Sequence, residues 1–258
     1  MTCKLVAEIG TCFGPYSRES FWDACEAALD CGADLVKVQI FDPKDLARRR
    51  GIGPEKLEPW DIRNFSSQCS GVSQGEEQSR LTEKCYRLVI GASVFGMYHL
   101  RTCIAPDMGH WGGLAFIKTA SSEWQHARLA EAASLQSCWD SIPLFVSVPP
   151  DATLAIGNYF SSQPITWLYC EPYYPANGRY NLDRLKQMAE RLPGRVGLSD
   201  HTDNLTLAQS ALREFPDLAV IEKHFCYNED LRGKTPDAGP WSLSQADFRK
   251  LAKVVHGS

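Results

Sequence analysis

The sequence of 258 residues contains no long hydrophobic run. No stretch approaches the roughly 18 consecutive apolar residues that a membrane-spanning helix requires, so a helical membrane protein is excluded. An excess of basic residues is also missing, because 27 lysines and arginines stand against 31 acidic residues, a net charge of −4. This balance favours neither nucleic acid nor an anionic membrane as a partner. An anionic substrate would therefore need a local cluster of donors.

Regular cysteine spacing is missing as well, although ten cysteines are present. No CxxC pair occurs, and Cys25, Cys85 and Cys170 fall inside apolar periodic segments, where a reduced cysteine behaves as a small hydrophobe. We expect free thiols in a reducing cytoplasm, with disulfides as the less favoured alternative. The N-terminus passes directly into a short apolar run that ends at Glu8, so no signal peptide is expected.

Short apolar segments alternate with helical patterns along the chain. Strands are expected at residues 5–9, 35–40, 88–94, 114–118, 143–147, 165–170, 195–199 and 218–223. Helices are expected to begin after Ser17 and after Ser244, because both serines can cap a helix N-terminus. Eight strands that alternate with helices predict an α/β fold, the parallel (β/α)₈ TIM barrel, with a doubly wound open sheet as the alternative.

The chain shows neither an internal repeat nor a linker, so we expect one TIM-barrel domain over residues 1–258. A polar stretch at about residues 42–78, rich in Arg, Gly and Ser, interrupts the alternation. Long connections of this kind are commonly functional or disordered. We expect this one to act as a lid or to be partly mobile.

Polar side chains gather where the expected strands end. In a parallel barrel the carboxyl ends of the strands form one face, which carries the active site. The residues at these ends include Glu8, Lys37, Gln39, Lys118, Ser121, Ser147, Glu171, Tyr174, Ser199, Asp200, His201, Glu222, Lys223 and His224. Any one of them could be a solvated loop residue or a paired core residue. Their recurrence from strand to strand predicts a shared site.

Two lysines of this set lie inside apolar strands. Burying an unpaired ammonium group is costly, so Lys37 and Lys118 each need an anionic partner. Together they predict a substrate that carries phosphate or carboxylate groups. Serine hydroxyls near the strand ends would complete the binding site.

Two histidines close strands that are neighbours in a barrel. Converging imidazoles of His201 and His224, with carboxylates such as Glu8 and Asp237 in reach, would suit a divalent transition-metal ion. Two unrelated loop histidines would show the same spacing, so the spacing alone leaves both interpretations open.

Six motifs follow one another over nearly the whole chain. They are Ala7-Glu8-Ile9-Gly10 with Gly32 to Phe41, Lys118 to Glu123, Tyr174-Pro175-Ala176, Gly197 to Thr202, Ile221 to Phe225, and Pro236-Asp237. This series resembles the N-acetylneuraminate (sialic acid) synthase family. One tetrapeptide would be weak evidence, whereas six motifs in the family's order and at barrel-like intervals are specific.

The resemblance implies a TIM-barrel transferase that condenses phosphoenolpyruvate with an aldehyde sugar or sugar-like acceptor and releases phosphate. It implies that His201 and His224 hold a catalytic Mn²⁺ or Mg²⁺ ion. Within this scheme Glu8 manages a proton or water, and Lys118 offsets phosphate charge. The resemblance assigns phosphoenolpyruvate to Lys37, Lys118, Ser121, Ser147 and Ser199, and the acceptor to Glu8, Gln39, Tyr174 and Asp237.

The sequence departs from the family pattern in several places. Cys12 and Phe13 stand where the family has Asn-His, Pro172 replaces a polar residue, and Ser93 to Gly96 matches the third-strand motif without its threonine. The chain also ends after the expected eighth helix, so we expect the family's C-terminal antifreeze-like domain to be missing. That domain supplies an arginine to the partner subunit's acceptor site. We therefore expect an acceptor other than N-acetylmannosamine, with a homodimer between barrels as one open option.

Two other functions remain open from the sequence. A metal-dependent aldolase or lyase could use the same barrel mouth on pyruvate or a related acid, although it would have no phosphate for Lys118 and the serines to hold. A non-catalytic binding barrel is the other interpretation, although such a protein would not need to keep His201, His224, Glu8 and Asp237.

Overall fold

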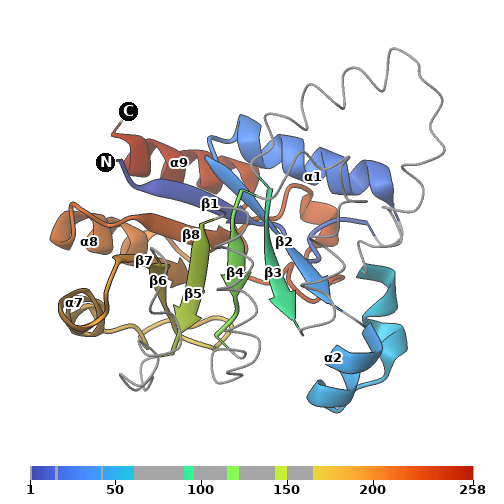
Figure 1. Cartoon of the computed structure of the whole chain (residues 1–258). Helices are drawn as coiled ribbons and strands as arrows, with labels where there is room; N and C mark the ends of the chain where they lie inside the picture. Colours follow the sequence, from blue (N-terminus) through green and yellow to red (C-terminus); the bar gives the residue numbers. More distant parts are fainter. Residues whose placement is uncertain are drawn as a thin grey trace.

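The structure is a computed structural model that describes residues 2–14, 17–41, 43–60, 90–95, 115–121, 143–149 and 165–257. Eight parallel strands close into a barrel in sequence order, and the last strand pairs with the first (Figure 1). The strands are β1 (Lys4–Glu8), β2 (Leu35–Phe41), β3 (Ile90–Phe95), β4 (Ile117–Thr119), β5 (Leu144–Val148), β6 (Ile165–Cys170), β7 (Arg195–Asp200) and β8 (Val220–His224). The predicted TIM barrel is confirmed, and the doubly wound open sheet is wrong because the sheet closes.

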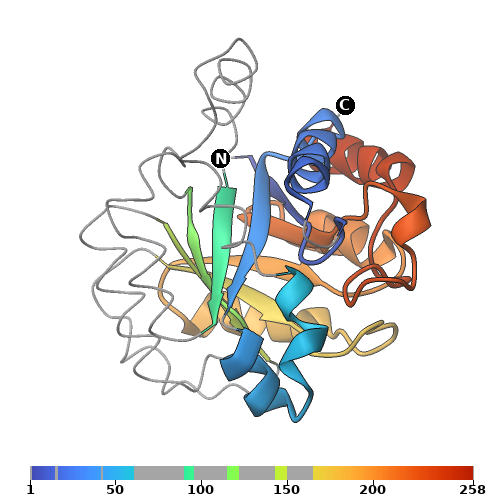
Figure 2. The ribbon, with the colours of Figure 1, turned by 90° about the vertical axis from the view of Figure 1, so that its right-hand side faces the viewer.

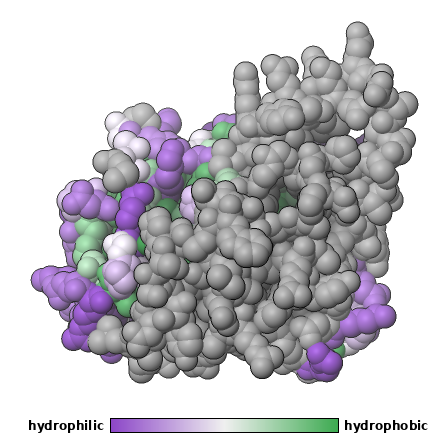
Figure 3. Space-filling model, viewed as in Figure 1, coloured by the Kyte–Doolittle hydropathy of each residue, from purple (hydrophilic) through white to green (hydrophobic). Residues whose placement is uncertain are grey.

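Helices cover the outside of the barrel. The longer ones are α1 (Arg18–Asp30), α2 (Pro43–Arg50), α7 (Leu182–Arg191), α8 (Thr206–Glu214) and α9 (Gln245–His256). Helices α1 and α9 lie side by side in both ribbon views (Figure 2), and α9 also contacts β1 and α8. The outer surface over α7 is mostly hydrophilic (Figure 3), in keeping with a helix that buries Leu185 and exposes most of its other residues.

The predicted capping serines begin their helices as expected. Ser17 Oγ accepts a hydrogen bond from Ser20 N at 3.2 Å, and Ser244 Oγ accepts one from Asp247 N at 3.1 Å. Each bond satisfies a backbone donor that has no partner within the helix. These contacts fix where α1 and α9 start, and so which apolar faces pack on the barrel.

The barrel interior changes from apolar to polar along the strands. Near the amino ends, a buried apolar cluster separate from the main core is formed by Val6, Phe116, Phe145, Leu168, Ala219 and Val220. Side chains two residues apart on a strand point to the same face. On five strands, the next inward-facing residue lies two positions closer to the carboxyl end of the strand. These residues are Glu8, Lys118, Ser147, Cys170 and Glu222. The alternation that fills the core also lines the barrel mouth.

The region expected as a long connection begins with regular structure. Helix α2 is followed by two 3₁₀ turns, η1 (Pro54–Lys56) and η2 (Glu58–Trp60). Residues 61–78 of that region lie outside the described part of the chain, as do the expected strand residues 88 and 89.

The described cysteines agree with the expected reduced state. Six of them are free and buried: Cys3, Cys12, Cys25, Cys31, Cys170 and Cys226. The other four lie outside the described ranges. Among the described helices, none combines the length and the apolar character needed to cross a membrane.

Candidate active site

A buried cluster of charges occupies the barrel mouth between β2, β4, β7 and β8. Glu222 Oε1 accepts hydrogen bonds from Lys37 Nζ at 3.0 Å, Lys118 Nζ at 2.5 Å and Ser199 Oγ at 2.9 Å. None of the four residues is more than 5% exposed. Two ammonium groups and a hydroxyl thus converge on one point, an arrangement that stabilises negative charge.

The charge states in this cluster follow from burial and from mutual pairing. Burial alone would raise the pKa of Glu222, but the ammonium groups of Lys118 and Lys37 outweigh it and hold that pKa far below its usual range. Burial lowers the pKa of Lys37; the Glu222 carboxylate opposes this shift and the Lys118 ammonium adds to it. Lys37 also forms an ion pair with Glu8. Lys37 therefore connects two carboxylates.

The residues that the resemblance assigns to the acceptor gather beside β1. Glu8 Oε1 accepts a hydrogen bond from Gln39 Nε2 at 3.3 Å. Asp237 lies next to Glu8 across Gly10, where a Cβ atom would meet Asp237 Oδ2 at 2.5 Å and Glu8 Oε1 at 3.1 Å. Thr11 fixes Asp237 Oδ2 through its backbone N and its Oγ1, both at 2.9 Å. Gly10, with φ +45°, is required because a side chain there would displace a carboxylate.

Two imidazoles form the other part of the mouth. His201 follows β7 and His224 ends β8, with ring centroids 5.5 Å apart. His201 Nδ1 donates to the Glu171 carbonyl oxygen at 2.8 Å, and because a carbonyl can only accept, the lone pair is on Nε2. Burial lowers the pKa of His201 to about 3 and that of His224 well below its usual value. Both rings are therefore neutral at physiological pH, the form that binds metals.

The free nitrogen of His201 faces other predicted site residues. Tyr174 stacks on the ring with centroids 4.2 Å apart, and its hydroxyl lies 3.3 Å from His201 Nε2. Ser199 Oγ lies 3.4 Å from the same nitrogen. Cys170 Sγ lies 4.0 Å from it and also contacts Ser121. Tyr174 is 49% exposed, so this edge of the site faces solvent.

The imidazole pair fits a divalent transition metal as a partial ligand set. His224 Nδ1 is buried and has no hydrogen-bond partner among the described residues. The carboxylates expected to join the histidines are engaged elsewhere, because Glu8 pairs with a lysine and Asp237 with Thr11. Within the described ranges, no group of three or more His, Cys, Asp and Glu side chains is arranged to hold an ion. A bound ion would take its other ligands from substrate or water.

Most of the predicted site residues meet at the barrel mouth. Contacts described above join Glu8, Lys37, Gln39, Lys118, Ser121, Tyr174, Ser199, His201, His224 and Asp237 in two adjoining groups. Ser147 is fully buried at an inward position of β5, and its Oγ has no hydrogen-bond partner among the described residues. The side chains of the third-strand motif, Ser93 to Gly96, lie outside the described part.

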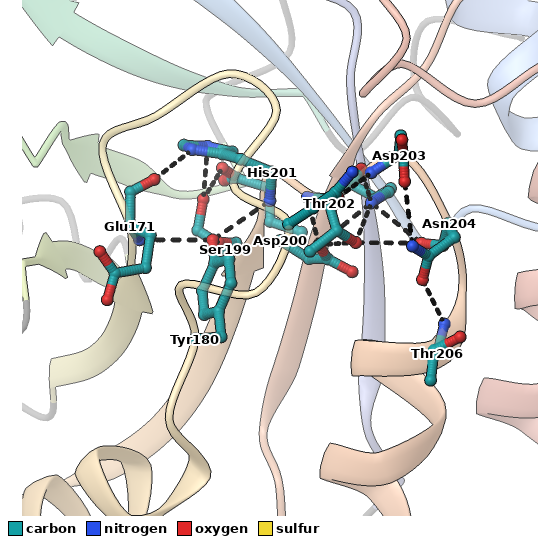
Figure 4. Close-up of polar contacts among 12 residues, drawn as sticks. Glu171, Tyr180, Ser199, Asp200, His201, Thr202, Asp203, Asn204 and Thr206 are labelled. Carbon is teal, nitrogen blue, oxygen red and sulfur yellow. Dashed lines mark hydrogen bonds and ion pairs between the residues drawn. The ribbon is translucent and has the colours of Figure 1, made fainter.

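Two residues of the site had no assigned role in the sequence analysis. Glu222 stood among the polar strand ends, and a signal was available, because it shares the face of His224 on β8. Tyr180 precedes α7, and its hydroxyl contacts three backbone groups of the mouth (Figure 4). No sequence pattern marks this tyrosine.

Solved structures that share this architecture include the following three. N-acetylneuraminic acid (sialic acid) synthetase from Leptospira borgpetersenii serovar Hardjo-bovis has a TM-score of 0.75 at 18% identity, covering 100% of this chain and 84% of that one. Spore coat polysaccharide biosynthesis protein spsE from Bacillus subtilis has a TM-score of 0.73 at 19% identity, covering 99% and 68%. A truncated 3-deoxy-D-arabino-heptulosonate 7-phosphate synthase from Thermotoga maritima has a TM-score of 0.63 at 11% identity, covering 99% and 86%. Such identities show the fold alone.

Sequence comparisons complete the assignment. A comparison with curated proteins gives no match. The sequence model of the NeuB family matches residues 24–257, which is most of the chain. The matched range includes Lys37, Lys118, His201, His224 and Asp237. The protein therefore belongs to the NeuB family.

Proposed function

We propose that this protein is a transferase that condenses phosphoenolpyruvate with an aldehyde sugar or sugar-like acceptor and releases phosphate. One observation carries the proposal. Lys37, Lys118 and Ser199 all donate to the same buried carboxylate oxygen, Oε1 of Glu222, beside two neutral imidazoles. Phosphoenolpyruvate carries both a carboxylate and a phosphate, the groups that two ammonium donors bind well. Membership of the NeuB family supports the same chemistry.

Substrate binding begins with an exchange of partners in this proposal. Lys37 and Lys118 turn from Glu222 to the anionic groups of phosphoenolpyruvate, with Ser121, Ser147 and Ser199 as further donors. The buried Ser147 hydroxyl, which no described residue engages, then gains a partner. Charge developing on the phosphate is offset by groups already in place before reaction.

His201 and His224 are the residues that would hold Mn²⁺ or Mg²⁺, and the bound ion would polarise the acceptor aldehyde. Carbon 3 of phosphoenolpyruvate attacks the aldehyde carbon, whose oxygen becomes an alkoxide, and positive charge develops at carbon 2. Water adds at carbon 2, and the bond from carbon 2 to the phosphate oxygen then breaks to leave a keto group. One proton of the water ends on the alkoxide and the other leaves with phosphate. Glu8 receives the proton of that water, because its carboxylate is held at the mouth by Lys37 and Gln39.

The acceptor in this proposal is not N-acetylmannosamine. Cys12 packs against Cys226 and Ala238, and Phe13 packs in the main core, so neither supplies the amide or imidazole that the family has at these positions. The acceptor side of the mouth consequently depends on Gln39, Tyr174 and Asp237. Six buried free thiols support a reducing cytoplasm as the place of action.

Phosphate release from phosphoenolpyruvate, measured with Mn²⁺ across a panel of aldoses, N-acyl hexosamines and nucleoside aldehydes, tests the function. We expect release to require both the metal and one class of aldehyde. Lys118→Met should lower kcat/KM at least about 100-fold, since it removes charge stabilisation in the transition state. Lys4→Met, at a lysine whose side chain is 51% exposed, is the matched control and should leave the rate unchanged.

Three outcomes would count against the proposal. If no aldehyde gives phosphate release although both metal and phosphoenolpyruvate bind, the proposed condensation reaction would be contradicted. Liberation of pyruvate from a 2-keto acid, without phosphate, would replace it by a metal-dependent aldolase or lyase. A normal rate with N-acetylmannosamine would leave the reaction in place and overturn the altered acceptor.

A further inference from the structure

Tyr180 brings a single hydroxyl into the junction between β6 and β7 (Figure 4). This hydroxyl donates to the Ser199 carbonyl oxygen at 2.5 Å, and it accepts from His201 N at 3.1 Å and from Glu171 N at 3.3 Å. A phenol oxygen offers one donor and two acceptor positions, so all of its capacity is used. Each partner belongs to a residue at the barrel mouth.

The same contacts reach the imidazole of His201 from two directions. The bond to His201 N fixes the backbone of the residue, and the bond to Glu171 N fixes the residue whose carbonyl oxygen accepts from His201 Nδ1 at 2.8 Å. The bond to Ser199 O fixes the strand whose hydroxyl lies 3.4 Å from His201 Nε2. One hydroxyl therefore locates the backbone, the Nδ1 partner and a neighbour of Nε2.

We propose that Tyr180 is a positioning residue that holds His201 in its Nδ1–H tautomer and directs the Nε2 lone pair into the site. The catalytic consequence rests on the function proposed above, whereas the positioning itself is a property of the chain. Groups that orient a metal-binding histidine fix its tautomer and its ring direction.

The hydroxyl acts apart from the packing of the ring. The ring of Tyr180 packs edge-on against Tyr169 with centroids 5.2 Å apart, and a phenylalanine would keep this contact. Burial raises the pKa of Tyr180 well above its usual value, so the hydroxyl keeps the proton that it donates. Removing the oxygen alone would leave two buried backbone N–H groups without their acceptor.

Tyr169 provides a matched control within the same cluster. Its hydroxyl donates to Glu171 Oε1 at 2.8 Å and accepts from Asn181 N at 3.2 Å. Neither partner is an atom of His201 or an atom that hydrogen-bonds to it. Tyr169→Phe thus removes a hydroxyl from the adjoining ring that contacts Glu171 only at its side-chain carboxylate, and not at the backbone N and O that orient the imidazole.

The test compares Tyr180→Phe with Tyr169→Phe by ¹⁵N NMR of histidine-labelled protein and by Mn²⁺ affinity from EPR titration. His201 signals are assigned from the spectrum of His201→Asn. We expect a pure Nδ1–H tautomer in the natural protein, a mixture of tautomers in Tyr180→Phe, and Mn²⁺ binding that is about 10- to 100-fold weaker in that variant. Tyr169→Phe should keep the tautomer and bind Mn²⁺ within about twofold of the natural affinity.

An unchanged tautomer in folded Tyr180→Phe, with unchanged Mn²⁺ affinity, would overturn the positioning role. An Nε2–H tautomer of His201 in the natural protein would overturn it as well, and this measurement does not depend on whether the variant folds. Failure of the natural protein to bind Mn²⁺ would contradict the metal part of the proposed function, while the tautomer comparison would still decide the role of Tyr180.

Discussion

Four charges are buried together at the mouth of the barrel, and their signs balance. Lys37 and Lys118 face Glu222, and Lys37 also faces Glu8, so two ammonium groups meet two carboxylates. Taking an ion from water costs several kcal/mol unless a partner compensates it. Each of these groups consequently depends on the others. Glu222 has the central part, because one of its oxygens contacts both lysines.

Replacing Glu222 by glutamine should expose this dependence. With one carboxylate gone, the two ammonium groups repel each other, so the free energy of unfolding should fall by about 3 kcal/mol in urea titrations. Inorganic phosphate should then raise the melting temperature of Glu222→Gln more than that of the natural protein, because the anion can pair with two ammonium groups that have lost the Glu222 carboxylate.

The control is Glu229→Gln, which breaks the pair with Arg232 at a carboxylate whose side chain is 63% exposed. Surface pairs contribute little, so its stability and its response to phosphate should match those of the natural protein. Equal phosphate shifts in Glu222→Gln and the natural protein would show that the lysines do not form an anion site.

The chemistry of single residues sets how much of this site the sequence can predict. Lys37 and Lys118 stand out because a lysine inside an apolar strand needs an anion, but the need alone does not identify which anion. In the structure Glu222 supplies it. Tyr180 could not be found this way, because its hydroxyl gains its role only from the path of the segment before α7.

At the scale of helices and strands, the elements that were predicted correctly are those marked by a local sequence signal. Ser17 and Ser244 mark the starts of α1 and α9, and short apolar runs mark the strands. Helix α2 fell in a region expected as a loop, because its sequence, PKDLARRR, has too few apolar residues to show helical periodicity. The start of β4 was also predicted too early, because the apolar run begins at residue 114 whereas the paired strand begins at Ile117.

A second charged cluster joins elements at the opposite end of the barrel from the site. Asp34, just before β2, accepts from Leu5 N of β1 at 2.8 Å and pairs with Lys4 at 3.2 Å and His256 of α9 at 3.1 Å. Burial alone would raise the pKa of Asp34, but the bonds from Leu5, His256 and Lys4 outweigh it and lower that pKa. The ionised carboxylate thus connects the first strand to the last helix.

Asp34→Ala should lower the free energy of unfolding by about 1–2 kcal/mol at pH 7, mainly through the loss of the acceptor for Leu5 N. Because the folded-state pKa lies below the unfolded one, this stabilisation is present above the unfolded pKa and is lost as pH falls through the folded pKa. Urea unfolding at pH 7 and at pH 3 measures both effects.

The exposed Asp23 on α1 offers a matched control, since Asp23→Ala changes charge equally without breaking a described bond to another element. Its effect should be within about 0.5 kcal/mol at both pH values. A difference between Asp34→Ala and the natural protein that grows as pH falls would contradict the assigned sign.

On the scale of the whole molecule, the site exists only when the barrel is closed. β1 pairs with β8 over five registered positions, which places Glu8 beside His224 and brings the Asp237 loop to Gly10. Glu222 likewise reaches Lys37 and Lys118 only across the closed barrel. No short segment contains a complete binding site, so a ligand that binds the mouth should stabilise the folded state as a whole.

Mn²⁺ should therefore protect the protein against thermal unfolding. At a concentration 100 times its Kd, binding to the folded state alone adds about 2.7 kcal/mol, which for a chain of this size raises Tm by roughly 5–10 °C. His201→Ala and His224→Ala should each abolish most of this shift. His256→Ala should retain it, because His256 pairs with Asp34 away from the mouth. A full Mn²⁺ shift in both mouth variants would place the ion elsewhere. Loss of the shift in His201→Ala and in His224→Ala, with the shift retained in His256→Ala, would mean that the ion needs both imidazoles. Closure of the barrel would then assemble the metal site, because it brings these two residues together.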